Sequence, residues 1–187
     1  MDRRVKYTKK VIKDTFINLL STKEINKITV SEICTIADIN RATFYRYYLD
    51  VYDLLDQIKN EFVIELKNAS IENKSNSVSG FTKDLLKTFL NNKELSKVLF
   101  QNKQATYFLN DILEIIYKKC KEIWQKDLPN IQEEDIEYAT VFIFNGALGI
   151  INFWIKNDFD KTADEIATTI ETLSYYGITK YIYKKNV

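Results

Sequence analysis

Hydrogen-bond donors are concentrated in residues 40–48, which read Asn-Arg-Ala-Thr-Phe-Tyr-Arg-Tyr-Tyr. The guanidinium of Arg41 can offer two parallel N–H groups to O6 and N7 of a guanine, and Arg46 adds a second cation nearby. Hydroxyl groups that suit phosphate oxygens, which fix the register of a protein on a duplex, are carried by Thr43, Tyr45 and Tyr47. Each tyrosine taken alone could instead be a half-buried core residue with a wet tip.

Helix-start signals place this segment on the second of two short helices. Thr29 can cap a helix that has a glutamate three residues later, which is the pattern of a capping box, and Asn40 can cap the next one. Only two residues separate the predicted helices 29–37 and 40–47, so they must meet in a tight turn, as in a helix-turn-helix. The backbone N–H groups at the two helix N-termini, at Thr29 and Asn40, are further candidates for phosphate binding.

Two more helices complete a small core around this motif. Apolar residues at helical spacing predict a helix over about Thr8–Ser21. Asp50 can cap a long helix over about 50–69, with Leu49 before the cap and Leu54 inside the helix as a hydrophobic staple. The four segments together predict a compact N-terminal unit.

Composition excludes several classes of protein. The 187 residues include only 4 Gly and 1 Pro, too few turn residues for a sandwich or barrel of short strands. Histidine is absent, which removes histidine triads and histidine metal sites, and Cys34 and Cys120 lie far apart without a Cys-x-x-Cys pair. No Gly-rich phosphate loop is present. We therefore expect no enzyme, no metal and no cofactor and, without a secretory signal, a cytoplasmic protein.

Charge is distributed unevenly although the net charge is only +1. Residues 1–47 carry ten basic and five acidic groups, a balance of +5. A basic unit on a nearly neutral body is typical of a small DNA-binding head, whereas the alternative is a solvated charge run near a terminus.

Helical spacing resumes after a polar stretch that predicts a loop at 70–80. The expected helices are 81–91, 93–101, about 104–126, 133–157 and, from a capping box of Thr162 and Glu165, 162–176. The predicted fold class is all-α, with about nine helices.

The segment from Ile28 to Tyr48, followed by Tyr-Asp-Leu-Leu at 52–55, resembles the DNA-binding head of TetR-type transcriptional regulators. The likeness is carried by the Thr-Val-x-x-Ile start, the short turn and Thr-Phe-Tyr-x-Tyr-Tyr, in the right order and spacing. The stretches 144–157 and 162–166 resemble a subgroup common in low-GC Gram-positive bacteria, some of whose members lie near dihydroxyacetone kinase genes. No regulated pathway is inferred from this likeness.

The resemblance implies a helix-turn-helix domain at 6–66 and a helical effector-binding and dimerisation domain at 70–187. It implies base reading by Arg41 and phosphate contacts by Thr43, Tyr45 and Tyr47. Two positions depart from the family pattern, because Asp38 replaces a turn glycine and Val51 replaces a phosphate-gripping lysine. We therefore expect a larger share of the DNA affinity from the basic residues Arg3, Arg4, Lys6 and Lys27.

In the family, the last two long helices pair with their copies in a four-helix dimer bundle, and this sequence agrees physically. Gly146 and Gly149 would allow close helix approach, and a helix this apolar needs burial on nearly all sides. The flanking residues are Phe142, Ile150 and Phe153 and, on the next helix, Ile166, Ile170 and Leu173. The uncharged stretch 138–155 also approaches the length of a membrane span, about 17–25 residues, but its asparagines and glycines favour a buried or interface helix.

A ligand pocket in the middle of the body is a further implication of the resemblance, although the same side chains could form ordinary core. Its candidate walls are Phe89, Leu99, Phe100, Tyr107, Phe108, Ile112, Tyr117 and Trp124. The function predicted from the sequence is a homodimeric repressor that binds double-stranded DNA at a near-palindromic operator and responds to an unidentified small molecule. The alternatives are an activator or co-regulator of the same fold, and a helical protein–protein adaptor that does not bind an operator.

Overall fold

The computed structural model describes residues 3–72, 78–101, 117–118, 121 and 133–185. Over these residues the chain forms α-helices and one short 3-10 helix, without strands, so the predicted all-α class is confirmed. The elements are α1 (Arg3–Leu20), η1 (Ile25–Lys27), α2 (Val30–Ile36), α3 (Arg41–Tyr45), α4 (Val51–Glu72), α5 (Val78–Asn91), α6 (Lys93–Gln101), α8 (Glu133–Lys156) and α9 (Ala163–Lys185). Most of the helix expected at 104–126 lies outside the described residues.

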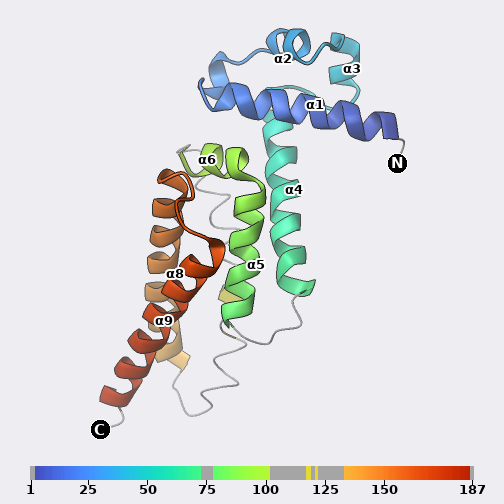
Figure 1. The fold of residues 1–187 in the computed structure, drawn as a ribbon. Coiled ribbons are helices and arrows are strands. Elements are labelled where there is room, and N and C mark those ends of the chain that lie inside the picture. Colours follow the sequence, from blue (N-terminus) through green and yellow to red (C-terminus); the bar gives the residue numbers. More distant parts are fainter. Residues whose placement is uncertain (1–2, 73–77, 102–116, 119–120, 122–132, 186–187) are drawn as a thin grey trace.

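The N-terminal helices form a head at one end of the molecule. Figure 1 shows α1 crossing the start of α4, with α2 and α3 on the side of α1 that faces away from the body. Ile12 and Phe16 of α1, Ile33 of α2 and Phe44 of α3 are fully buried and share one core with the first turns of α4. The predicted packing of the helix-turn-helix on the first helix is therefore confirmed.

The turn between α2 and α3 closes with a Schellman motif. The N–H of Ile39 donates to the carbonyl of Cys34 (3.0 Å) and the N–H of Asp38 donates to the carbonyl of Thr35 (3.4 Å). This pairing requires the left-handed conformation at the residue after the C-cap, and Asp38 has φ of 50°. Aspartate tolerates this conformation better than most residues but less well than glycine.

The start of α4 differs from the prediction in one respect. Asp50 caps the helix, since its Oδ1 accepts the N–H groups of Tyr52 and Asp53, both at 2.8 Å. The expected staple between Leu49 and Leu54 is wrong, because Leu54 is fully buried whereas Leu49 is 80% exposed. The N–H of Leu49 donates to Oδ2 of Asp53 (2.8 Å), so a polar contact holds the chain where an apolar contact was expected.

The loop predicted at 70–80 is too long. Helix α4 continues to Glu72, and α5 begins at Val78 rather than at residue 81. Helix α9 is also longer than expected, because it passes through Gly177 and ends at Lys185 rather than near Tyr176. The bounds of α6 match the prediction, and those of α8 agree within one residue.

The long helices of the body, α4, α5, α8 and α9, run roughly along the length of the molecule (Figure 1). Helix α5 packs against both α4 and α9, α8 packs against α9, and the short helix α6 contacts α1 of the head as well as α8. Helix α6 therefore joins the head to the C-terminal pair of helices.

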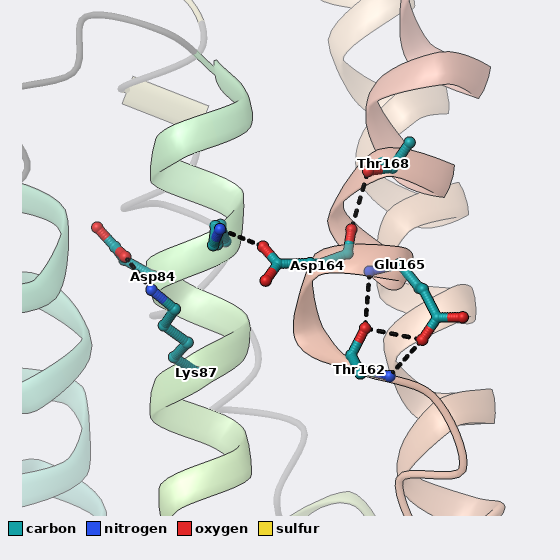
Figure 2. A network of polar contacts seen from close by, with 7 residues as sticks. Asp84, Lys87, Thr162, Asp164, Glu165 and Thr168 are labelled. Carbon is teal, nitrogen blue, oxygen red and sulfur yellow. Dashed lines mark hydrogen bonds and ion pairs between the residues drawn. The ribbon is translucent and has the colours of Figure 1, made fainter.

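A reciprocal capping box holds the start of α9, as predicted. Figure 2 shows Glu165 Oε2 accepting both the N–H (2.8 Å) and the hydroxyl (2.7 Å) of Thr162, while the N–H of Glu165 donates to the Thr162 hydroxyl (3.2 Å). The neighbouring Asp164 pairs with Lys83 of α5. This contact ties the first turn of α9 to the helix beside it.

Candidate nucleic-acid interface

Helix α3 is anchored by apolar residues and presents its polar residues to solvent. Phe44 is fully buried and Tyr48 is 5% exposed. Arg41, Tyr45 and Arg46 are exposed, with Tyr45 at 55%. The remaining two predicted contact residues, Thr43 and Tyr47, are partly buried.

Thr29 and Asn40 are helix caps, as the sequence predicts. Thr29 Oγ1 accepts the N–H of Glu32 at 3.2 Å. Asn40 Oδ1 accepts both the N–H (2.7 Å) and the hydroxyl (2.8 Å) of Thr43. These side chains therefore fix the two helix starts, and the single hydroxyl proton of Thr43 is directed to Asn40. A phosphate contact by Thr43 requires its hydroxyl to rotate away from the cap.

The guanidinium of Arg41 reaches back across the turn to the first helix of the motif. Its Nη2 donates to Oγ of Ser31 at 2.9 Å. Burial raises the pKa of the neighbouring Cys34 thiol, and the charge of Arg41 partly opposes this rise. Ser31 was not among the residues predicted from the sequence, although the two-residue turn that brings the helix starts together was a signal for it.

Lys9 of α1 contacts the two tyrosines that follow α3, Tyr47 and Tyr48. Its Nζ lies 5.5 Å from the ring centre of Tyr47 and 5.8 Å from that of Tyr48, within reach of a cation–π interaction. Burial, with smaller contributions from Glu61 and Asp53, raises the pKa of Tyr48 to about 12. Tyr48 is thus a neutral core residue, and Tyr47 lies between this core and the surface.

Several basic residues of the head are neutralised within the chain. Lys13 pairs with Glu61 (3.3 Å), and Lys23 pairs with Glu32. Lys27, one of the residues expected to support DNA affinity, lies 3.6 Å from Glu24. Arg3 and Lys6 are exposed on the first turn of α1, and Arg4 is exposed there as well.

Val51 cannot replace the phosphate-gripping lysine of the family pattern. Its side chain is 7% exposed and belongs to the core, whereas the next residue, Tyr52, is 50% exposed. The first turn of α4 therefore offers a phenol hydroxyl and the Asp50 carboxylate rather than an ammonium group.

Some of the predicted ligand-pocket residues lie in a packed aromatic row. Phe89 of α5 is 1% exposed and lies edge-to-face between Phe62 of α4 (5.7 Å between ring centres) and Phe100 of α6 (5.5 Å). Leu99 is also buried, and Tyr117 is partly buried. The other candidates, Tyr107, Phe108, Ile112 and Trp124, lie outside the described residues.

The predicted dimer residues divide into an exposed set and a buried set. On α8, Phe142 is 75% and Phe153 is 69% exposed, Gly146 and Gly149 are exposed, and Ile150 is partly buried. On α9, Leu173 is 60% exposed. Ile166 and Ile170 instead lie in the core of the chain, at 6% and 5% exposure, so we remove them from the expected interface.

The exposed residues of α8 form one apolar stripe. A Cβ at Gly146 or Gly149 would meet no atom within 4 Å, so neither glycine is required for packing within the chain. Tyr138 and Val141 extend the stripe toward the start of the helix, at 65% and 58% exposure. Residues Glu137–Lys156 are long and apolar enough to cross a membrane by length and composition, and most of this stretch is not buried within the chain.

Among the described residues, no group of three or more histidine, cysteine, aspartate or glutamate side chains could hold a metal ion.

Comparison with known families and structures gives a consistent result. Residues 76–176, more than half of the chain, match a TetR family model described as the C-terminal region of transcriptional regulators. A search of curated proteins gives no match.

Several solved structures share the fold. The dihydroxyacetone kinase operon activator DhaS is 21% identical, with a TM-score of 0.68 over 92% of this chain and 96% of its own. A TetR transcriptional regulator from Streptococcus agalactiae is 20% identical, with a TM-score of 0.65 over 92% and 96%. SmeT, the repressor of a multidrug efflux pump in Stenotrophomonas maltophilia, is 12% identical, with a TM-score of 0.65 over 90% and 89%.

Proposed function

The chain belongs to the TetR family of transcriptional regulators, and on this premise we propose that it binds a near-palindromic DNA operator as a homodimeric repressor released by a small molecule. We assign DNA binding to residues 6–66 and effector binding and dimerisation to residues 70–187, in the cytoplasm. Members of this family are DNA-binding regulators and not enzymes.

The observation that carries the proposal is the outward face of α3. A five-residue helix, capped at Asn40 and anchored by Phe44, carries Arg41 and Tyr45 on its exposed side. In a helix-turn-helix the N-terminal residues of the second helix contact base edges in the major groove. Arg41 is therefore assigned to guanine, and Tyr45, Arg46 and Tyr47 are assigned to the backbone.

The exposed apolar stripe of α8 supports the homodimer. Apolar side chains such as Phe142 and Phe153 gain free energy when a second copy removes them from water. A two-fold axis through such a face makes the contact self-complementary. The same dimer would place two copies of α3 in successive major grooves, about 34–36 Å apart or a multiple of that spacing.

The structural relatives bear on the effector and on the sign of regulation. A complex of SmeT with triclosan has been solved, and by analogy we propose an apolar effector for this chain, bound beside Phe89 and Phe100. SmeT is a repressor, whereas DhaS is an operon activator. Activation is therefore the second candidate, since the same fold serves both.

Binding to duplex DNA at a series of salt concentrations tests the proposal, together with sedimentation of the protein alone. We expect a dimer at micromolar concentration and an affinity that falls steeply with salt because counterions are released from the phosphates. A protein–protein adaptor would not bind DNA. A membrane protein would need detergent to remain in solution, and a stable monomer would contradict the proposed dimer.

A further inference from the structure

We propose that Ser31 is a positioning residue, which holds the guanidinium of Arg41 in the orientation that reads one base of the operator. This inference rests on the proposed function, because it concerns the DNA-reading role assigned to Arg41. A residue on the first helix of the motif would thus contribute to the sequence specificity of the second helix.

The contact joins the two helices of the motif at their starts. Ser31 lies on the first turn of α2, and Arg41 is the first residue of α3. Arg41 Nη2 donates to Ser31 Oγ at 2.9 Å, and both residues are exposed. The position of the guanidinium is therefore determined by both helices rather than by α3 alone.

An exposed arginine without such a contact samples many rotamers. Its side chain loses part of its rotamer entropy when the guanidinium is fixed on a base. A hydrogen bond to Ser31 restricts the rotamers of Arg41 before DNA binds. It also favours one direction in which the guanidinium can approach a base. The gain in affinity is limited to the base pair that Arg41 contacts. Loss of the bond to Ser31 should therefore change the base preference at that position only.

The bond to Ser31 leaves enough donors for a base. A guanidinium has five N–H groups and no acceptor, and the contact with Ser31 uses one of them on Nη2. The second Nη2 proton and the Nη1 protons remain for O6 and N7 of a guanine, which require two donors. Ser31 can thus stay in place while Arg41 reads the base.

A double-mutant cycle on the full-length protein tests this assignment. The variants are Ser31→Ala, Ser31→Thr, Arg41→Ala and Ser31→Ala combined with Arg41→Ala. Thr35→Ala is the matched control, because Thr35 is an exposed hydroxyl residue one turn further along α2 whose hydroxyl donates to the Ser31 backbone carbonyl and has no bond to Arg41. Each protein is used to select fragments from a random duplex pool, and its affinity for the wild-type consensus is measured.

We expect Ser31→Ala to weaken consensus binding by about three- to tenfold, the value of one net hydrogen bond, and to relax the preference at one position per half-site. That position should be the one relaxed by Arg41→Ala, Ser31→Thr should restore it, and Ser31→Ala should have no effect in the Arg41→Ala background. The Thr35→Ala protein should select the wild-type consensus.

Four results would overturn the inference. Tighter binding by Ser31→Ala would mean that the bond holds Arg41 away from DNA. An equal loss with and without Arg41 would mean that Ser31 contacts a phosphate itself. If the wild-type protein enriches no sequence, the proposed function fails and this inference fails with it, whereas a wild-type consensus that Ser31→Ala leaves unchanged refutes only the positioning role.

Discussion

The side-chain oxygen of Asn40 accepts two hydrogen bonds from one residue, the backbone N–H and the hydroxyl of Thr43. The cap that begins α3 is therefore also the partner of a residue expected to contact phosphate. Asn40 therefore affects both the stability of α3 and the chemistry of its exposed face. Different substitutions of Asn40 can distinguish the effect on stability from the effect on DNA binding.

Asn40→Ala should lower the free energy of unfolding by about 1 kcal/mol, the usual cost of losing an N-cap. Asn40→Asp should keep the stability because aspartate caps equally well. The added negative charge next to the phosphates should nevertheless weaken DNA binding, most strongly at low salt. Urea unfolding and a binding titration on the same preparations measure both effects. Wild-type affinity in the aspartate variant would show that the start of α3 lies away from the DNA.

Replacing the left-handed turn residue Asp38 by glycine should not lower the free energy of unfolding. With φ of 50°, the position strains most side chains by about 1–2 kcal/mol, so Asp38→Gly should be neutral or slightly stabilising. Asp38→Val should destabilise the head by about 1–2 kcal/mol, since a β-branched residue suits this conformation least. The midpoints of urea unfolding test the ranking, and equal stability of the glycine and valine variants would contradict the turn geometry.

The buried phenol of Tyr48 should make stability depend on pH in the alkaline range. Its pKa is raised from 10.0 to about 12 in the folded protein, so the folded state holds the proton more tightly than the unfolded state. The resulting stabilisation is complete below pH 10 and is lost as the pH rises toward 12. Tyr48→Phe removes this contribution, so the difference in unfolding free energy between wild type and variant should shrink between pH 10 and 12. A constant difference would mean that Tyr48 ionises normally.

A charge on the exposed stripe of α8 should separate the subunits without unfolding them. Phe142→Glu is chosen because Phe142 is 75% exposed, so the chain's own core does not need it. We expect a helical monomer in sedimentation and weaker operator binding. Ile64→Glu is the control, since Ile64 is a similarly exposed apolar residue on α4, at 56%. A Phe142→Glu protein that remains dimeric would place the interface elsewhere.

Local signals predicted the head well. The caps at Thr29, Asn40 and Asp50 depend on residues within three positions of each other, so the pattern alone contains the interaction. The predicted staple at Leu49 is wrong because another local contact forms there. The Asp53 carboxylate accepts the backbone N–H of Leu49. Polar composition misplaced the ends of α4 and α5, since exposed helix ends can be as polar as loops.

Contacts between segments could not be predicted in the same way. A helical pattern shows that Ile166 and Ile170 share an apolar face, but it does not show that α5 and α8 of the same chain bury that face. Ser31 and Lys9 were missed because their importance depends on distances across the head. The last helix was expected to end near Tyr176, yet it continues through Gly177, because a helix tolerates one glycine at a cost of about 1 kcal/mol.

Selection of bound fragments from a random duplex pool, at moderate salt and with wild-type, Arg41→Ala and Tyr45→Phe proteins, is the decisive test of operator reading by α3. A near-palindrome is expected for the wild type. Arg41→Ala should cost about 1–3 kcal/mol and relax one base position per half-site, and Tyr45→Phe should weaken binding evenly across sequences. No enriched sequence from a confirmed dimer, or a consensus indifferent to Arg41, would contradict the claim that α3 reads an operator.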